Sequence, residues 1–218
     1  MKRLFIAIAC LALMLGCGTA KEDAMKAEQK IADLQKELDK FAPVELTFDA
    51  SVLNDQQKEV VRKLVDAAKI MDKLFLVQSW KGNPELIQKL SASTDPVDAK
   101  TLELVRLYFG PFNRLNHNKP FVDGVGEKPA GAGYYPEDMT KEEFEALEDE
   151  NKSSLYTLIR RNEEGELSVH PYHEVFAEKV QKAHDLLLQA ADLAEDEGLQ
   201  NYLRLRAEAL LNDDYQAS

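Results

Sequence analysis

Apolar residues spaced three and four positions apart predict amphipathic helices over much of this chain. The first of these patterns covers residues 21–40, where Leu34 and Leu38 recur among charged and amide side chains. Pro43 ends the pattern, because proline has no backbone N–H with which to continue a helix. The region therefore predicts a one-sided helix followed by a break.

The clearest helical pattern begins at Asn54 and runs to Trp80. Asn54 is a good helix start, because its side chain accepts a hydrogen bond from a free amide of the first turn. The same capping chemistry, with proline in the first turn, predicts shorter helices after Asn83 and after Asp95. Two closing helices, which we expect to form an antiparallel pair, are predicted for residues 176–191 and 199–211.

Strand patterns are fewer. Val44, Leu46 and Phe48 alternate with polar residues and predict a short strand. Residues 155–161 and 166–172 favour β-structure and flank a turn of a length suited to a β-hairpin. The predicted fold class is mainly α with a small β component (α+β), in which helices surround a long Gly/Pro loop and a β-hairpin.

Glycine and proline interrupt every regular pattern between residues 110 and 138. Loops of this length are uncommon in compact domains and are often functional. Disordered linkers usually lack aromatic residues, so we expect this loop to be ordered. Its aromatic residues are Phe112, Phe121, Tyr134 and Tyr135. A capping box of Thr140 and Glu143 predicts that a helix follows it.

The first residues have the pattern of an export signal. Lys2 and Arg3 precede an apolar run from Leu4 to Gly16. The run is shorter than the roughly 20 residues that cross a bilayer as a helix, so it does not predict a permanent transmembrane span.

The end of this signal resembles a bacterial lipobox. The sequence Leu-Met-Leu-Gly-Cys at residues 13–17 predicts cleavage after Gly16 and attachment of a diacylglyceryl group to Cys17. Residues 1–16 are then a lipoprotein signal peptide, and the expected location is the cell envelope, anchored to a membrane. The alternative is a plain secretory signal cut near Ala20, which would discard Cys17.

Composition and charge limit the partners. A hydrophobic fraction of 44% with 30% charged residues is typical of a globular protein. The net charge of −12 makes nucleic acid an unsuitable partner and disfavours adsorption to anionic lipid. The acyl group is thus the expected membrane attachment. Cys10 lies inside the signal, so the processed chain has no pair of cysteines for an internal disulfide.

The histidines do not form a helical zinc-peptidase motif, which needs two histidines one turn apart with a glutamate between them. His173-Glu174 begins like this motif, but no second histidine follows. His170 and His173 could be read as a metal cluster with Glu174, although Pro171 breaks the regular geometry between them. A strand-to-helix junction explains the same residues as polar caps, and we expect no metal site and no catalytic residue in this chain.

Several short motifs that occur in order resemble a known family. They are YFGPFNRL at 108–115, NKPF at 118–121, GEKPAGA at 126–132, YPEDMT at 135–140, VHPY at 169–172 and NDDY at 212–215. Together they look like bacterial dipeptidyl-peptidase III-like zinc hydrolases, the M49 peptidase type. The likeness extends from about Leu46 to Ser218.

This resemblance implies part of a larger two-lobed fold, with a helical zinc-bearing lobe and a mixed lobe, that releases dipeptides from peptide N-termini. With the helical pattern before Pro43 read as a tether from the anchor, the chain divides into a helical tether, residues 17–43, and the N-terminal region of such a hydrolase, residues 44–218. In that family the zinc motif His-Glu-x-x-Gly-His lies farther along, so zinc is expected in the full-length family and no zinc ligand is carried over here.

Two functions follow as hypotheses. The first is the N-terminal portion of an exported hydrolase of this type, inactive alone and completed by a missing C-terminal catalytic portion. The alternative is a non-enzymatic envelope lipoprotein that acts as a binding or scaffolding module. For a peptide substrate, the expected binding residues are the polar groups of the loop, which can hold a peptide backbone or carboxylate. They are Asn113, Arg114, Asn116, Asn118 and Lys119.

Overall fold

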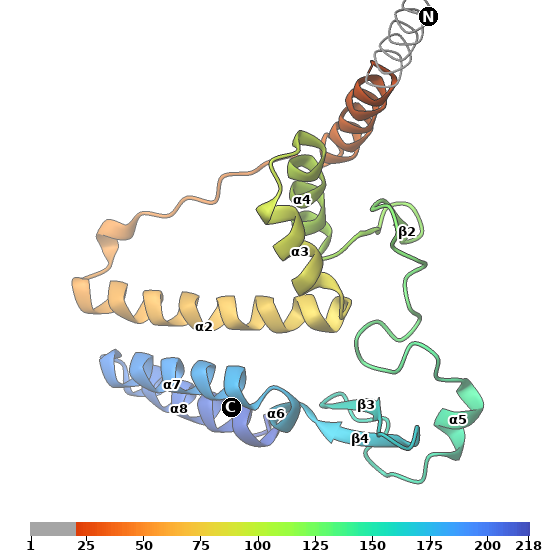
Figure 1. Ribbon diagram of the computed structural model, residues 1–218. Coiled ribbons are helices and arrows are strands. Elements are labelled where there is room, and N and C mark those ends of the chain that lie inside the picture. Colours follow the sequence, from red (N-terminus) through yellow and green to blue (C-terminus); the bar gives the residue numbers. More distant parts are fainter. Residues whose placement is uncertain (1–20) are drawn as a thin grey trace, which may run out of the picture. The chain divides into compact units, whose positions relative to one another are not determined.

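The computed structural model describes residues 21–218. Helices dominate this region and its strands form two small antiparallel sheets, so the predicted mainly α fold with a small β component is confirmed (Figure 1). The signal peptide (residues 1–16) and the lipidation at Cys17 lie outside the described residues, and the tether (residues 17–43) also stays a prediction. None of the described helices combines the length and apolar character that crossing a membrane requires.

The chain divides into two compact units. The described part of one unit consists of residues 21–45 and Glu85–Pro111, and the other consists of Leu46–Pro84 and Phe112–Ser218. All the elements that carry the predicted binding loop belong to the second unit.

The first unit contains a helix over residues 21–38, then α3 (Asn83–Ala92), which enters it at Glu85, and α4 (Pro96–Tyr108). Asp95 caps α4, because its carboxylate accepts a hydrogen bond from the backbone N–H of Val97 at 2.8 Å. The helix start predicted from the cap at Asp95 is therefore confirmed, whereas α3 begins at Asn83 itself, the residue that the sequence predicted to precede it.

Apolar side chains hold the first unit together. Leu34, Leu104 and Val105 are buried, and the ring of Phe41 meets that of Tyr108 edge-on with centroids 5.5 Å apart. The apolar face predicted for residues 21–40 is thus a packed face.

The second unit begins with α2 (Asp55–Ser79), the longest described helix. Its start is the capping box of Asn54 and Gln57: Asn54 Oδ1 accepts from Gln57 N at 2.8 Å, and Gln57 Oε1 accepts from Asn54 N at 3.1 Å. Each side chain satisfies the other residue's free amide, which fixes where the helix begins. The helix ends at Ser79, close to the end that the sequence predicted near Trp80.

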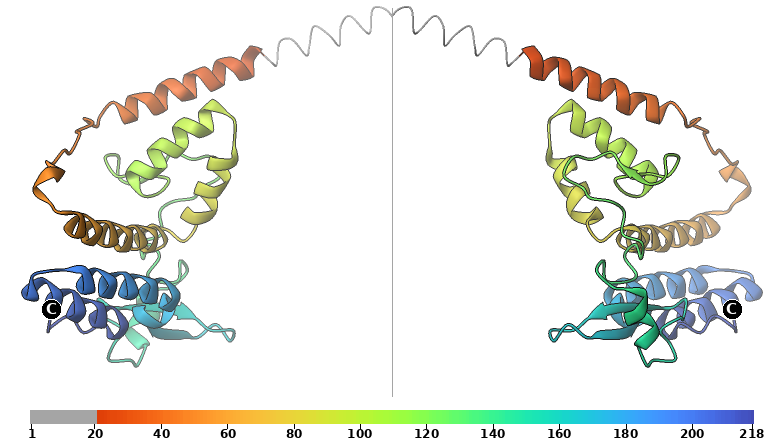
Figure 2. Two further views of the ribbon diagram at one scale, coloured as in Figure 1. Left: turned by 90° about the vertical axis from the view of Figure 1, so that its left-hand side faces the viewer. Right: turned by 90° about the vertical axis from the view of Figure 1, so that its right-hand side faces the viewer.

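Helix α2 packs against α7 (Ala177–Leu193), and α7 packs against α8 (Glu197–Asn212) on its other side; α7 and α8 lie side by side in both views (Figures 1 and 2). This confirms the predicted closing pair. Small side chains prevail in the core and let the helix backbones approach closely. The buried core residues are Val60, Ala67, Leu187, Ala190, Ala191, Ala194, Leu203 and Ala207.

The predicted hairpin is confirmed as β3 (Thr157–Arg161) and β4 (Leu167–Pro171), which pair antiparallel with Ile159 opposite Val169. A short helix, α6 (Tyr172–Val175), follows β4 directly. The sequence pattern did not predict α6, because one turn is too short to show a helical period.

Helix α5 (Lys141–Ala146) is fixed at both ends. Thr140 and Glu143 form the predicted capping box at its start. At its end, Lys152 Nζ donates to the carbonyl oxygen of Leu147 at 2.7 Å. These caps stabilise a helix that is too short to be stable by itself.

The strand predicted for Val44, Leu46 and Phe48 is wrong. These residues have neither helical nor strand structure, their side chains are exposed, and the next element is a single 3₁₀ turn, η1 (Ala50–Val52). A strand exists only when a second strand pairs with its backbone, and no strand of residues 21–218 does so here.

Candidate functional site

A small hairpin inside the Gly/Pro loop carries all five residues that the sequence proposes for binding. Strand β1 (Phe112–Asn113) pairs antiparallel with β2 (Lys119–Pro120), with Asn113 opposite Lys119. The ring of Phe112 meets Trp80 edge-on with centroids 5.8 Å apart, which holds β1 against the end of α2. The loop is ordered as predicted. Its two strands were missed because two residues cannot show a period of two.

The turn of this hairpin is held by its own backbone. The carbonyl oxygen of Asn113 accepts hydrogen bonds from the N–H groups of Asn116 (3.0 Å) and Asn118 (2.9 Å). The side-chain Oδ1 of Asn113 accepts from Leu115 N at 3.0 Å. His117 and Asn118 are left-handed, with φ of 50° and 58°, a conformation that asparagine and histidine adopt more readily than most residues. The turn therefore has one defined backbone conformation.

One side of the hairpin opens into a surface hollow of about 610 Å³. Within residues 21–218, the ammonium groups of Lys119 and Lys128 are in no hydrogen bond or ion pair. The hollow also contains one carboxylate, that of Glu127, so its two lysines leave a net positive charge in a chain of net charge −12, which favours a negative group there. Its lining residues are Asn116, His117, Asn118, Lys119, Pro120, Glu127, Lys128, Pro129 and Ala130.

The structure brings together three of the five proposed binding residues. Asn116, Asn118 and Lys119 line the hollow. Asn113 is only 6% exposed, so its side chain serves the turn described above. Arg114 is exposed on the turn and does not line the hollow. Whether these residues bind a ligand stays a prediction.

Among the lining residues that the sequence did not propose, those with polar side chains are His117, Glu127 and Lys128. Their positions depend on how the loop returns to the hairpin, which no local pattern encodes. One signal was present: each lysine precedes a proline, in Lys119-Pro120 and Lys128-Pro129, and a residue before proline favours extended backbone. The two Lys-Pro pairs therefore indicate two extended segments, each of which contains a lysine.

A few residues after the hollow along the chain, the loop is clamped to α2 and β3 by its backbone. The N–H of Gly133 donates to the carbonyl oxygen of Gln78 at 2.8 Å, and Ile159 N donates to the carbonyl oxygen of Tyr134 at 3.0 Å. Arg160 adds two bonds, one to the carbonyl oxygen of Gly133 and one to that of Tyr134, both at 3.0 Å. The contact is close: a Cβ on Gly133 would lie 2.3 Å from the carbonyl oxygen of Val77.

The ring of Tyr134 stacks on that of Tyr172, with centroids 6.4 Å apart. Burial, with the neighbouring Tyr134, raises the pKa of Tyr172 to about 12. The Tyr172 phenol therefore stays protonated at neutral pH and acts here as a packing group.

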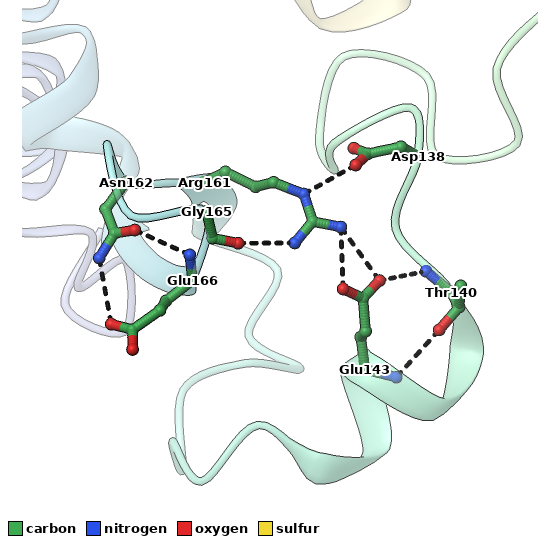
Figure 3. A network of polar contacts seen from close by, with 7 residues as sticks. All are labelled: Asp138, Thr140, Glu143, Arg161, Asn162, Gly165 and Glu166. Atoms are coloured by element: carbon green, nitrogen blue, oxygen red, sulfur yellow. Dashed lines mark hydrogen bonds and ion pairs between the residues drawn. The ribbon is translucent and has the colours of Figure 1, made fainter.

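Arg161 on β3 links the loop to α5 and to the hairpin turn (Figure 3). Its guanidinium donates to Asp138 Oδ2 at 2.9 Å, to both carboxylate oxygens of Glu143 at 3.0 Å, and to the carbonyl oxygen of Gly165 at 2.9 Å. A planar guanidinium suits such a set of partners because its donors have fixed directions. Arg161 thus joins segments that lie far apart in the sequence.

This network shifts the titration of its members. The hydrogen bond from the backbone of Thr140, followed by those from Arg161, lowers the pKa of Glu143. In turn, the hydrogen bonds to Glu143 raise the pKa of Arg161. Both shifts favour the charged pair, so the network is intact at neutral pH.

Three of the four histidines, His170, His173 and His184, are engaged in side-chain contacts within the fold. His170 Nε2 lies 2.8 Å from Ser168 Oγ, and His173 Nδ1 lies 2.7 Å from Asp213 Oδ2. In residues 21–218, no three or more His, Cys, Asp or Glu side chains are arranged to hold a metal ion. The described residues do not fit the zinc that the resemblance implies for the full family, and we assign them no step that uses it.

The fold and loop have counterparts among solved structures of dipeptidyl-peptidase III. The structure from Caldithrix abyssi is 46% identical in sequence, with a TM-score of 0.80, over 84% of this chain and 36% of that chain. The structure from Corallococcus sp. strain EGB is 36% identical, with a TM-score of 0.80, over 86% of this chain and 36% of that chain. The resemblance expected from the loop motifs is therefore confirmed.

A curated protein is also similar: Nudix hydrolase 3 of Arabidopsis thaliana, 26% identical over 89% of this chain and 32% of that protein. No protein-family model matches the sequence. The chain spans about a third of the length of the relatives that it matches. The comparisons establish that this chain shares the fold of about a third of each dipeptidyl-peptidase III structure and is similar to both in sequence.

The first prediction concerns the clamp that follows the hollow along the chain. Gly133→Ala should lower the free energy of unfolding by about 1–3 kcal/mol, because the new Cβ would clash with carbonyl oxygens at the end of α2. Urea denaturation measures this. The matched control is Gly126→Ala in the same loop, where a Cβ meets nothing within 4 Å and the change should stay within about 0.5 kcal/mol. Equal effects of the two substitutions would rule the clamp out.

The second prediction concerns the Arg161 network and pH. The pKa of Glu143 is lowered in the folded chain, so the unfolded chain takes up the proton first as pH falls. The stability that this carboxylate contributes is present near neutral pH and is lost as pH drops below about 4.

Urea denaturation between pH 7 and 3 should therefore show a shallower loss of stability in Glu143→Gln than in the unmodified chain. Glu142→Gln, which removes a neighbouring carboxylate outside the Arg161 contacts, should keep the original pH dependence. If the stability of Glu143→Gln fell with pH in parallel with that of the unmodified chain, the assignment of this pH dependence to Glu143 would be contradicted.

Proposed function

We propose that this chain is the N-terminal, substrate-binding portion of an exported hydrolase of the dipeptidyl-peptidase III type, and that it does not catalyse hydrolysis alone. The observation that carries the proposal is the likeness to the Caldithrix abyssi structure, at 46% identity over 84% of this chain. Because the chain matches only 36% of that structure, we place the zinc and the catalytic groups in polypeptide beyond this match.

The hollow beside β1 and β2 is the proposed contact for a peptide substrate. The two ammonium groups, Lys119 and Lys128, suit a carboxylate of the peptide, since charge-assisted hydrogen bonds are stronger than neutral ones. The side-chain amides of Asn116 and Asn118 each offer a donor and an acceptor, which is what the peptide groups of a substrate require. The rigid turn holds these groups in place before the ligand arrives, which limits the entropy lost on binding.

The proposed location is the cell envelope, with Cys17 lipidated. The support is the order of the N-terminal features: two basic residues, an apolar run ending at Gly16, then Cys17. A single acyl chain binds membranes only weakly, so stable anchoring needs the several chains that a lipoprotein cysteine carries. The acidic chain adds no electrostatic attraction to anionic lipid.

The third prediction tests the hollow. An acidic hexapeptide should bind the chain without being cleaved, and Lys119→Gln or Lys128→Gln should each raise its Kd about threefold to tenfold through the loss of one charged contact. Lys179→Gln, which removes an exposed positive charge on α7, is the matched control and should leave Kd nearly unchanged. Isothermal titration calorimetry gives the Kd, and mass spectrometry of the peptide reports cleavage.

Two results would overturn this part of the proposal. Equal effects of all three lysine substitutions would remove the hollow from the binding site. Release of dipeptides by the chain alone in zinc-containing buffer, stopped by a chelator, would show that its own residues catalyse.

The fourth prediction tests the anchor. In a bacterial host, the chain should incorporate radioactive fatty acid and fractionate with membranes, and Cys17→Ala should lose both properties because the acceptor thiol is absent. Cys10→Ala serves as the control, since that cysteine lies inside the predicted signal. Labelling that survives Cys17→Ala would exclude this residue as the site.

A further inference from the structure

A second hollow adjoins the first one along the Gly/Pro loop. It measures about 340 Å³ and shares Ala130 with the hollow that contains Lys119 and Lys128. All the residues that line the two hollows belong to the second unit. Ligand pockets usually measure about 300–1,000 Å³, so this size suits one large side chain better than a whole ligand. We call it the aromatic hollow, and its apolar and aromatic lining residues are Ala130, Gly131, Tyr135, Pro136, Met139 and Phe144.

The polar side chains at the aromatic hollow already have partners. Glu137 Oε1 lies 3.2 Å from Lys81 Nζ, and Lys141 Nζ lies 3.4 Å from Glu145 Oε1. Thr140 Oγ1 accepts from the backbone N–H of Glu143 at 3.1 Å, in the capping box of α5. The charges of the lining are therefore balanced, which distinguishes this hollow from the one with two unpaired lysines and favours an apolar group in it.

Two aromatic rings form walls whose positions are fixed. The ring of Tyr135 meets that of Phe144 edge-on, with centroids 6.0 Å apart. Tyr135 also packs directly on the loop backbone, because a Cβ on Gly131 would lie 2.8 Å from its ring. Phe144 follows Glu143 on α5, the residue that Arg161 holds (Figure 3). The two rings are thus in place before a ligand arrives, which limits the entropy lost on binding.

Met139 gives the lining some adaptability. Its backbone is placed by the hydrogen bond from its N–H to the carbonyl oxygen of Pro136, at 3.1 Å, and its side chain is half-buried. A methionine side chain has three rotatable bonds and a polarizable sulfur that makes favourable contacts with aromatic rings. Together with the two aromatic walls, it suits a large apolar or aromatic side chain.

The spacing of the two hollows sets the spacing of the groups that they can hold. Lys128 and Ala130 are two residues apart, so their Cα atoms are separated by at most about 7.6 Å. In an extended peptide, side chains two positions apart lie on the same face at about 6.6–6.8 Å, whereas adjacent side chains lie on opposite faces. A carboxylate at the lysines and an apolar side chain in the aromatic hollow therefore fit two residues of one peptide that are two positions apart.

We propose that the aromatic hollow binds a large apolar or aromatic side chain of a peptide whose acidic residue, two positions away, contacts Lys119 and Lys128. This inference rests on the proposed function and names the class of substrate side chain that the site selects. The lysines supply charge complementarity and the aromatic hollow supplies apolar burial, so the two together distinguish such a peptide from one that is only acidic.

The fifth prediction tests the two hollows together in the full chain. The probes are hexapeptides with blocked ends, one glutamate, and either phenylalanine or alanine two positions from it. Phenylalanine should lower Kd roughly tenfold relative to alanine, because its ring leaves water on binding. Peptides with phenylalanine before and after the glutamate are both measured, since either chain direction can place the two side chains. Isothermal titration calorimetry gives each Kd.

A phenylalanine directly next to the glutamate is the control among the peptides. It should give little gain over alanine, because adjacent side chains of an extended peptide point to opposite faces.

Variants of the chain locate the gain. Met139→Gln should reduce the gain from phenylalanine to about threefold or less, since a polar amide replaces part of the apolar lining. It should leave the Kd of the alanine peptide unchanged, which also shows that the variant is folded. Met71→Gln is the matched control: Met71 is a half-buried methionine on α2 that lines neither hollow, so the full gain should remain.

Phe144→Leu provides a second measurement if Met139→Gln is destabilised. It keeps an apolar residue on α5 but removes one aromatic wall, and it should reduce the gain at least about twofold.

The outcomes distinguish the two proposals. If no peptide binds in a way that depends on Lys119 and Lys128, both the proposed peptide contact and the aromatic hollow are contradicted. If the peptides bind through the lysines but phenylalanine gives no gain, or an adjacent phenylalanine gains as much, the aromatic hollow alone is overturned. The same conclusion follows if the gain persists in both Met139→Gln and Phe144→Leu.

Discussion

The arrangement of the second unit depends on the close approach of Gly133 to the last turn of α2. Only a residue without a Cβ fits there, since an added Cβ would lie 2.3 Å from a carbonyl oxygen, and its N–H donates to Gln78. From this point the chain passes directly to Tyr134, which accepts from the backbone of β3. One contact thus fixes the course of a long loop between a helix and a hairpin.

The candidate site needs this support. Strands β1 and β2 contain two residues each, and a pair so short is not stable without packing against other elements. The Trp80 contact at one end and the Gly133 clamp at the other hold the loop against α2. The hollow with its two lysines is therefore built on an ordered frame, and a ligand would meet groups already in position.

The proposed function follows from the extent of the match to dipeptidyl-peptidase III. The chain matches about a third of each dipeptidyl-peptidase III structure, so the proposal places catalysis in polypeptide outside that match. The acidic chain with a locally basic hollow fits a binding role for the part described.

The sequence alone determined the helix starts at Asn54, Asp95 and Thr140, because a capping side chain and the amide that it binds lie within three residues of each other. Local patterns also determined the hairpin turn and the antiparallel closing pair. The loop motifs also carried the family resemblance. Tertiary structure decided what joins distant segments: the place of Lys128 beside Lys119, the reach of Arg161 to Glu143, and the clamp at Gly133. The alternation at Val44 to Phe48 was correctly recognised and wrongly interpreted, because a helix satisfies its own backbone whereas a strand forms only when a second strand accepts its hydrogen bonds.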